Sequence, residues 1–148
     1  MSALAEPLDV MTLAEALRPA LLKVSRRLRQ ESAKAGVSAQ DALLIGHILR
    51  HPGIGVSGLA EAEQTSKPTM SSHVKRLEAA GWISRRGDAA DGRRSGLEVT
   101  PAGLRQVEAV RRRRNDWLAA RLKKLSPAER ERLAAAAEPL LRLMSLEP

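Results

Sequence analysis

Residues 55–100 read GVSGLAEAEQTSKPTMSSHVKRLEAAGWISRRGDAADGRRSGLEVT, and this stretch decides the fold. The pattern predicts a short helix at 56–63 and a second helix that begins after the N-cap residue Ser66. Met70, Val74 and Leu77 follow at i, i+4 and i+7, so they form the buried face of that second helix. Beyond Gly81 the pattern predicts two short strands, at 82–86 and 96–100, which flank a polar and basic tip.

A helix-turn-helix followed by such a hairpin is typical of a winged helix. In that fold the second helix enters the DNA major groove, and the wing approaches the neighbouring minor groove. The polar face of the second helix therefore becomes a candidate DNA-reading surface, with an ordinary solvated helix surface as the alternative. Its expected DNA-contacting residues are Ser66, Lys67, Pro68, Thr69, Ser71, Ser72, His73, Lys75 and Arg76.

The wing tip places arginines at the turn of the hairpin, where they could enter a narrow minor groove. We expect Arg93 and Arg94 to make these contacts together with Arg86. Asp91 would oppose DNA binding if it pointed outward, so we expect it to orient one of the arginines through a charge-assisted pair.

Amphipathic helices flank the winged-helix lobe, which we place at residues 37–100. Helices at 9–33, interrupted by Pro19, and at 101–146 carry apolar stripes that a small lobe cannot cover. The later segment has two helix starts, Thr100-Pro101 and a capping box from Ser126 to Glu129. A mainly structural helix after Ser38 should bury Leu43, Leu44, Ile45, Ile48 and Leu49.

The whole chain, 1–148, is thus expected to be one mainly α subunit with a small β-hairpin wing. Pairing with a second copy would bury the stripes. The expected dimerisation residues are Leu13, Leu17, Leu21, Leu118, Leu122, Leu133, Leu140 and Leu141. The alternative is a monomer in which these helices wrap the winged helix.

The charge balance points to a polyanionic partner. The 148 residues include 25 Lys and Arg against 17 Asp and Glu, a net charge of +8. The excess lies on the candidate DNA-reading unit, 66–94, and on the following helix, 101–125. Cysteine is absent, which excludes disulfides and thiol redox sensing. No secretory signal or membrane-spanning apolar run is evident, so a cytoplasmic protein is expected.

Other motifs in the chain have simpler interpretations than a metal site, a phosphate contact or catalysis. His47 and His51 are spaced as two metal ligands on a helix, but a partly buried structural role for His47 is favoured, and no metal or cofactor is expected. Arg111 to Arg114 are expected to form pairs within their helix, such as Arg112 with Asp116 or Arg111 with Glu108, rather than to contact phosphates. No catalytic constellation or nucleotide-binding glycine loop is present, so an enzyme is not expected.

The ordered motifs resemble the multiple antibiotic resistance regulator (MarR) family of bacterial transcription factors over nearly the whole chain. The matching segments are 37–40 (VSAQ), 59–61 (LAE), 66–69 (SKPT), 74–78 (VKRLE), 81–83 (GWI), 91–94 (DGRR), 99–103 (VTPAG) and 125–130 (LSPAER). Asp91 and Arg93 match the Asp-x-Arg of the family's wing. Trp82 stands where the family usually has a smaller aliphatic residue, and Gly92 adds flexibility to the wing.

This resemblance implies a triangular homodimer that binds a pseudo-palindromic site in double-stranded DNA and commonly represses its own or neighbouring genes. Many members respond to small anionic ligands bound between the dimer helices and the DNA-binding lobe, so a small-molecule effector of unknown identity is implied. The chain contains neither Tyr nor Phe, which argues against a pocket lined by those residues. The competing hypothesis is a winged-helix interaction module or a non-specific DNA-binding protein without ligand response.

Overall fold

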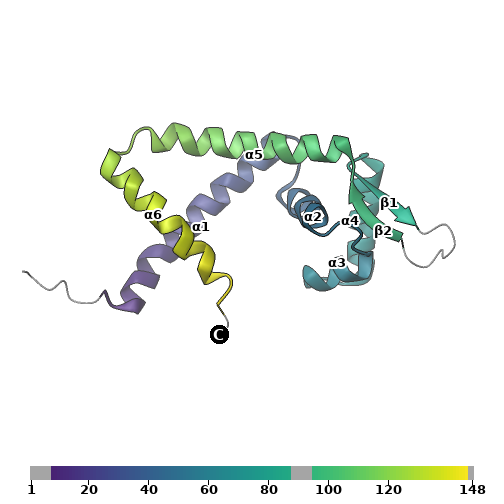
Figure 1. The fold of residues 1–148 in the computed structure, drawn as a ribbon, viewed down its shortest axis with the longest axis horizontal. Coiled ribbons are helices and arrows are strands. Elements are labelled where there is room, and N and C mark those ends of the chain that lie inside the picture. The colour runs from purple at the N-terminus through teal and green to yellow at the C-terminus, as the bar shows by residue number, and fades with distance from the viewer. Residues whose placement is uncertain (1–7, 88–94, 147–148) are drawn as a thin grey trace, which may run out of the picture.

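A computed structural model describes residues 8–87 and 95–146. Over these residues the fold is mainly helical, with six helices and one antiparallel hairpin (Figure 1). The elements in chain order are α1 (Val10–Lys34), α2 (Ala39–Arg50), α3 (Val56–Ala62), α4 (Lys67–Ala79), β1 (Ile83–Gly87), β2 (Ser95–Val99), α5 (Pro101–Leu122) and α6 (Pro127–Leu143). The expected helix-turn-helix and hairpin are confirmed as α3, α4, β1 and β2.

The core of the lobe joins α2, α3, α4 and the hairpin. Met70, Val74 and Leu77 are fully buried, as their spacing predicts. The expectation that Leu43 and Leu49 also pack inward is wrong, since they are 50% and 37% exposed. Helix α2 buries a single stripe against the lobe, and these two leucines lie outside it. The core comprises Leu44, Ile45, Ile48, Leu59, Ala60, Met70, Val74, Leu77, Ile83, Leu97 and Val107.

The segment before α3 fastens the hairpin to the rest of the lobe. Leu97 donates to the carbonyl of Ile54 at 2.8 Å, and Gly53 donates to the carbonyl of Leu97 at 2.9 Å. A Cβ on Gly96 would lie 2.6 Å from the Gly53 carbonyl oxygen, so this close approach of two backbones requires glycine. The base of the wing is thereby fixed relative to α2 and α3.

Helices α1, α5 and α6 extend away from the lobe. Helix α5 leaves the end of β2 and crosses the molecule, and α6 follows it at the opposite end (Figure 1). Helix α1 is continuous through Pro19, and α6 begins with the predicted capping box of Ser126 and Glu129. None of the described helices is long and apolar enough to cross a membrane.

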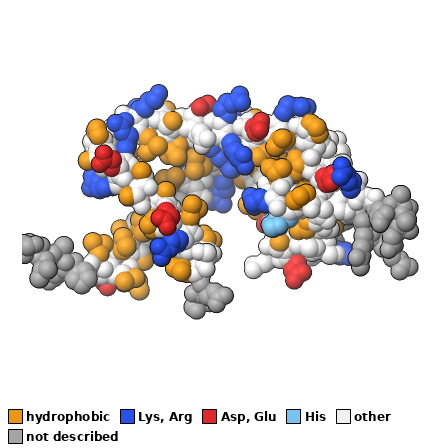
Figure 2. Space-filling view, in the orientation of Figure 1, with side chains coloured by type: hydrophobic (Ala, Val, Ile, Leu, Met, Phe, Trp, Pro, Cys, Tyr) orange, Lys and Arg blue, Asp and Glu red, His pale blue; other side chains and the backbone are white. Residues whose placement is uncertain are grey.

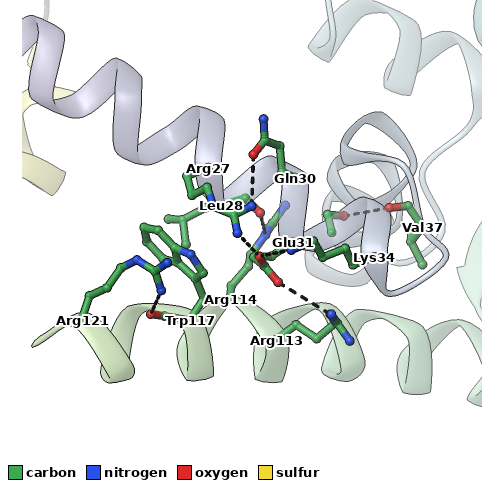
Figure 3. A network of polar contacts seen from close by, with 11 residues as sticks. Arg27, Leu28, Gln30, Glu31, Lys34, Val37, Arg113, Arg114, Trp117 and Arg121 are labelled. Atoms are coloured by element: carbon green, nitrogen blue, oxygen red, sulfur yellow. Dashed lines mark hydrogen bonds and ion pairs between the residues drawn. The ribbon is translucent and has the colours of Figure 1, made fainter. Parts of the chain in front are cut away.

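A polar network joins α1 to α5 (Figure 3). The buried carboxylate of Glu31 pairs with Arg27 at 2.9 Å, Lys34 at 3.0 Å and Arg113 of α5 at 3.8 Å. The hydrogen bond from Lys34, followed by the nearby positive charges, holds the pKa of Glu31 below its ordinary value. Glu31 therefore serves as an anionic centre between the two helices.

The arginine run of α5 behaves differently from the expectation. The pairs within the helix, Arg112 with Asp116 and Arg111 with Glu108, are not found among the ion pairs of the described residues. Instead Arg113 reaches Glu31, and Arg114 Nε donates to the carbonyl of Leu28 at 3.2 Å. About two turns farther along α5, the guanidinium of Arg121 stacks 3.9 Å from the Trp117 ring centroid. Side chains of this run thus connect α5 to α1.

Candidate nucleic-acid interface

Helix α4 begins at a well-formed cap. The Ser66 hydroxyl oxygen accepts from the backbone N–H of Thr69 at 3.2 Å, and the Ser66 hydroxyl donates to Thr69 Oγ1 at 2.7 Å. Pro68 occupies the first turn, where a missing N–H costs no helical hydrogen bond. The first turn keeps unpaired backbone amides and the positive end of the helix dipole at the surface, an arrangement that favours a phosphate.

The two faces of α4 are distinct in chemistry. Opposite the buried residues, the exposed face carries Lys67, Pro68, Thr69, Ser72, Lys75 and Arg76, with Ser71 and His73 half-buried at its edges. Ser72 donates to the carbonyl of Pro68 at 3.2 Å, so its lone pairs remain available as acceptors. Helix α4 therefore presents the predicted residues together, on one surface of small hydroxyls and cations suited to base edges and phosphates.

Arg76 has a partner that sequence reasoning did not identify. Its Nη2 pairs with Oδ1 of Asp41 in the first turn of α2, and lies 3.1 Å from His73 Nδ1. The Asp41 side chain is 11% exposed, whereas the Arg76 side chain is 51% exposed. Arg76 thus holds α4 to α2 while part of its guanidinium faces solvent.

The wing strands carry two further ion pairs. Arg85 Nε lies 2.9 Å from Glu78 Oε1 at the end of α4, and Arg86 Nε lies 3.1 Å from Glu98 Oε2 on the opposite strand. Arg86 is thus placed on the wing, as expected. Asp91, Arg93 and Arg94 lie outside the described residues.

Lys67 and Lys75 of α4 differ from Arg76 in their ion pairing. Within 8–87 and 95–146, no carboxylate lies within 4.0 Å of the ammonium group of Lys67 or Lys75. Both side chains are exposed. Their charge is therefore available to a polyanion, and flexible lysine stems suit phosphate oxygens.

His47 and His51 lie in the last turn and at the C-cap of α2, before the helix-turn-helix. His47 Nδ1 is 3.3 Å from Glu63 Oε1, and the rings of His47 and His51 are 4.9 Å apart. The described residues contain no cluster of three or more His, Cys, Asp or Glu that could hold a metal ion. His47 is half-buried and connects α2 to the end of α3.

A cavity of about 740 Å³ lies behind the lobe, between α1, α2 and α5. Its apolar lining includes Leu21, Val24, Leu28, Leu43, Val107 and Val110, and its lining arginines are Arg29, Arg50, Arg111 and Arg114. None of the described residues that line it is aromatic or acidic. Leu43, which was expected in the core, thus lines this cavity instead.

Comparisons with known proteins agree with this architecture. The MarR family model matches residues 35–94. An HTH-type transcriptional regulator of Mycobacterium bovis is 31% identical over 136 residues, which cover 92% of this chain and 95% of the relative. A Pseudomonas aeruginosa protein whose crystal structure is described as that of a transcriptional regulator is 29% identical in sequence to this chain. The match covers 96% of this chain and 100% of that protein, and the two structures superpose with a TM-score of 0.81.

A Staphylococcus aureus MepR mutant, solved bound to an oligodeoxyribonucleotide, has the same fold. It is 23% identical with a TM-score of 0.69, over 89% of this chain and 97% of its own. The chain belongs to the MarR family of winged helix-turn-helix DNA-binding transcriptional regulators.

Proposed function

We propose that the protein is a homodimeric repressor that binds a pseudo-palindromic operator and is released from it by a small ligand. The observation that carries this proposal is the segregation of two surfaces. Helix α4 offers a polar and cationic face, whereas α1 and α6 offer exposed apolar side chains at the other end of the chain. The first surface suits DNA, and the second suits another copy of the protein.

The apolar surface supports the homodimer. Helix α6 contains no buried residue. Its Leu141 is 75% exposed, and Met144 at its C-cap is 87% exposed. Figure 2 shows hydrophobic side chains gathered at the end of the molecule where α6 and α1 are drawn. Exposed patches of this kind mark interaction sites, and an amphipathic helix gains most of its stability from packing.

The proposed dimerisation leucines lie on this part of the fold. Leu13, Leu21, Leu133 and Leu141 are exposed, whereas Leu17, Leu118, Leu122 and Leu140 are half-buried. A second copy of α1, α5 and α6 would cover the exposed set. Two α4 helices related by a twofold axis would then meet half-sites whose centres are about 10 base pairs apart, or a multiple of that distance.

Ligand release is supported by the position of the cavity. Helices α1 and α5 belong to the proposed dimerisation part, and α2 belongs to the DNA-binding lobe, so the cavity lies where a ligand could change the angle between them. A ligand that binds one angle better shifts the population toward it. Such a change would alter the spacing of the two α4 helices.

The test is binding of the purified protein to the DNA upstream of its own gene, in about 150 mM salt with excess random competitor. We expect a footprint with dyad symmetry, two subunits per site, and lower transcription from that promoter in vitro. Binding equal to that of competitor DNA on this promoter and on genome-wide selected fragments would instead favour the non-specific DNA-binding alternative.

A further inference from the structure

The four arginines that line the cavity between α1, α2 and α5 have no anionic partner in the described part of the chain. Arg29, Arg50 and Arg111 are exposed, and Arg114 is half-buried. No carboxylate of residues 8–87 and 95–146 lies within 4.0 Å of any of the four guanidinium groups. Four cations that face one recess repel one another, and an anionic ligand would relieve that repulsion.

Arg114 shows that part of the recess is shielded from water. Its guanidinium donates to the carbonyl of Leu28 at 3.2 Å, which satisfies one of its five N–H donors. Burial lowers the pKa of Arg114 from its ordinary value. A charge in such surroundings binds an anion more strongly than an exposed charge does.

Gly46 lines the cavity on the α2 side. It lies in the interior of α2, where alanine would favour the helix by roughly 1 kcal/mol. A Cβ at this position would meet only Arg50 Nη1, at 3.5 Å, which is an ordinary contact. The backbone therefore does not require glycine, and the space left by the missing side chain is occupied by the guanidinium of Arg50 at the cavity wall.

The rest of the wall is aliphatic. Val107 and Val110 are buried behind the cavity, while Leu21, Val24 and Leu43 are between 43% and 50% exposed. Without a lining aromatic residue, the cavity offers no ring on which a planar ligand could stack. A flexible alkyl chain, by contrast, gains from every methylene that it buries against such a wall.

We propose that this cavity binds an amphipathic anion with an unbranched alkyl chain, its head group held by the arginines and its chain packed against Val24, Leu28 and Leu43. The cavity volume is within the range of small-molecule sites. A fatty acid and an alkyl phosphate share the required chemistry. This proposal rests on the proposed ligand-released regulator, because it names the class of ligand that would act there.

The first experiment is calorimetric titration of the DNA-free protein with alkyl carboxylates below their micellar concentrations. We expect decanoate to bind roughly tenfold tighter than octanoate, because two more methylenes are buried. Decanol, which lacks the charge, should bind at least about tenfold more weakly than decanoate. Equal binding of decanol and decanoate, or tighter binding of salicylate than of decanoate, would overturn the assignment.

Neighbouring arginines provide a matched control. Arg111 lines the cavity and Arg112 does not, although both are exposed residues of α5. Arg111→Gln should weaken decanoate binding at least about fivefold, and Arg112→Gln should leave it within about twofold. Gly46→Leu, which favours the helix but fills the cavity, should abolish binding. Unchanged binding in both Arg111→Gln and Gly46→Leu would place the ligand elsewhere and refute the proposal.

Two further measurements separate the hypotheses. Titration with decyl phosphate identifies the head group, since binding of either alkyl anion supports the shared chemistry. Release of labelled operator DNA is then measured at saturating ligand. Cavity binding without release would uphold the ligand class and refute ligand-released repression, whereas release that persists in Gly46→Leu would refute the cavity as its cause.

Discussion

Arg76 on α4, the proposed DNA-reading helix, is held by the buried carboxylate of Asp41 on α2. The two residues are 35 positions apart in sequence. Asp41 also lies between Gln40 and Ala42, two residues that line the cavity. The same turn of α2 therefore lines the cavity on one side and contacts α4 on the other. A displacement of this turn by a ligand would be transmitted to α4 through the ion pair.

We expect Asp41→Asn to weaken operator binding even though Asp41 is buried on α2 and is not part of the polar surface of α4. Loss of the charged partner removes a restraint on α4, and the dissociation constant should rise about tenfold, or about 1.4 kcal/mol. The free energy of unfolding should fall by roughly 1 kcal/mol, since Arg76 is half-exposed and recovers hydration. Fluorescence anisotropy with labelled operator and urea unfolding measure the two effects.

A panel of operators with single base-pair changes tests the role of Arg76. If Arg76 positions α4, Arg76→Ala and Asp41→Asn will weaken binding to every operator by similar factors, and the double variant will add little. A change of preference at one base pair in Arg76→Ala alone would show that Arg76 leaves Asp41 to contact a base, as we expected from the sequence.

The sequence was informative where structure depends on near neighbours. The spacing of Met70, Val74 and Leu77 predicted the buried face of α4, and Ser126 with Glu129 predicted the start of α6. These features need only helical periodicity or a single turn of backbone. The same holds for the polar surface of α4, which is the complement of its buried face.

Contacts between distant segments could not be predicted in this way. Asp41 lies three residues after the N-cap Ser38, where an acidic residue has a sufficient local explanation at the start of a helix. The position of Leu43 in the apolar stripe of α2 could not show whether its side chain packs into the core or lines a cavity. Nothing in the sequence around Arg113 indicated that its partner would be Glu31, which lies on α1.

Lys75 should contribute to DNA affinity without contributing to sequence preference. It is exposed on α4 without an ion-pair partner among the described carboxylates. Lys75→Ala should weaken binding to all operators alike and reduce the slope of log affinity against log salt by about 1. Lys123→Ala at the far end of α5 serves as the control. An unchanged slope in Lys75→Ala would remove this lysine from the DNA interface.

Leu141→Asp should shift the protein from dimer to monomer. Leu141 is 75% exposed on α6, so a charge there costs the protomer little but would be buried in the proposed interface. Analytical ultracentrifugation should show the change in mass, and operator binding should fall together with it. Leu104→Asp, at a 40% exposed leucine near the start of α5, is the control. Persistence of the dimer in Leu141→Asp would exclude this face of α6 from the interface.

Glu31 should make the stability contributed by the contact between α1 and α5 depend on pH in the acid range. Its pKa in the folded protein is lowered from the ordinary value of 4.5, chiefly by the hydrogen bond from Lys34. The ionised carboxylate therefore contributes stability that is fully present above pH 4.5 and is lost as the pH falls through the lowered pKa. Glu31→Gln lacks this contribution at every pH.

The difference in unfolding free energy between the parent protein and Glu31→Gln should thus be constant near neutral pH and shrink as the solution is acidified below pH 4.5. Urea unfolding at a series of pH values measures it. Glu108→Gln, which removes an exposed carboxylate from α5, controls for the change in net charge. A difference that stays constant down to the acid limit of folding would show that Glu31 stabilises the joint by packing and not by its charge.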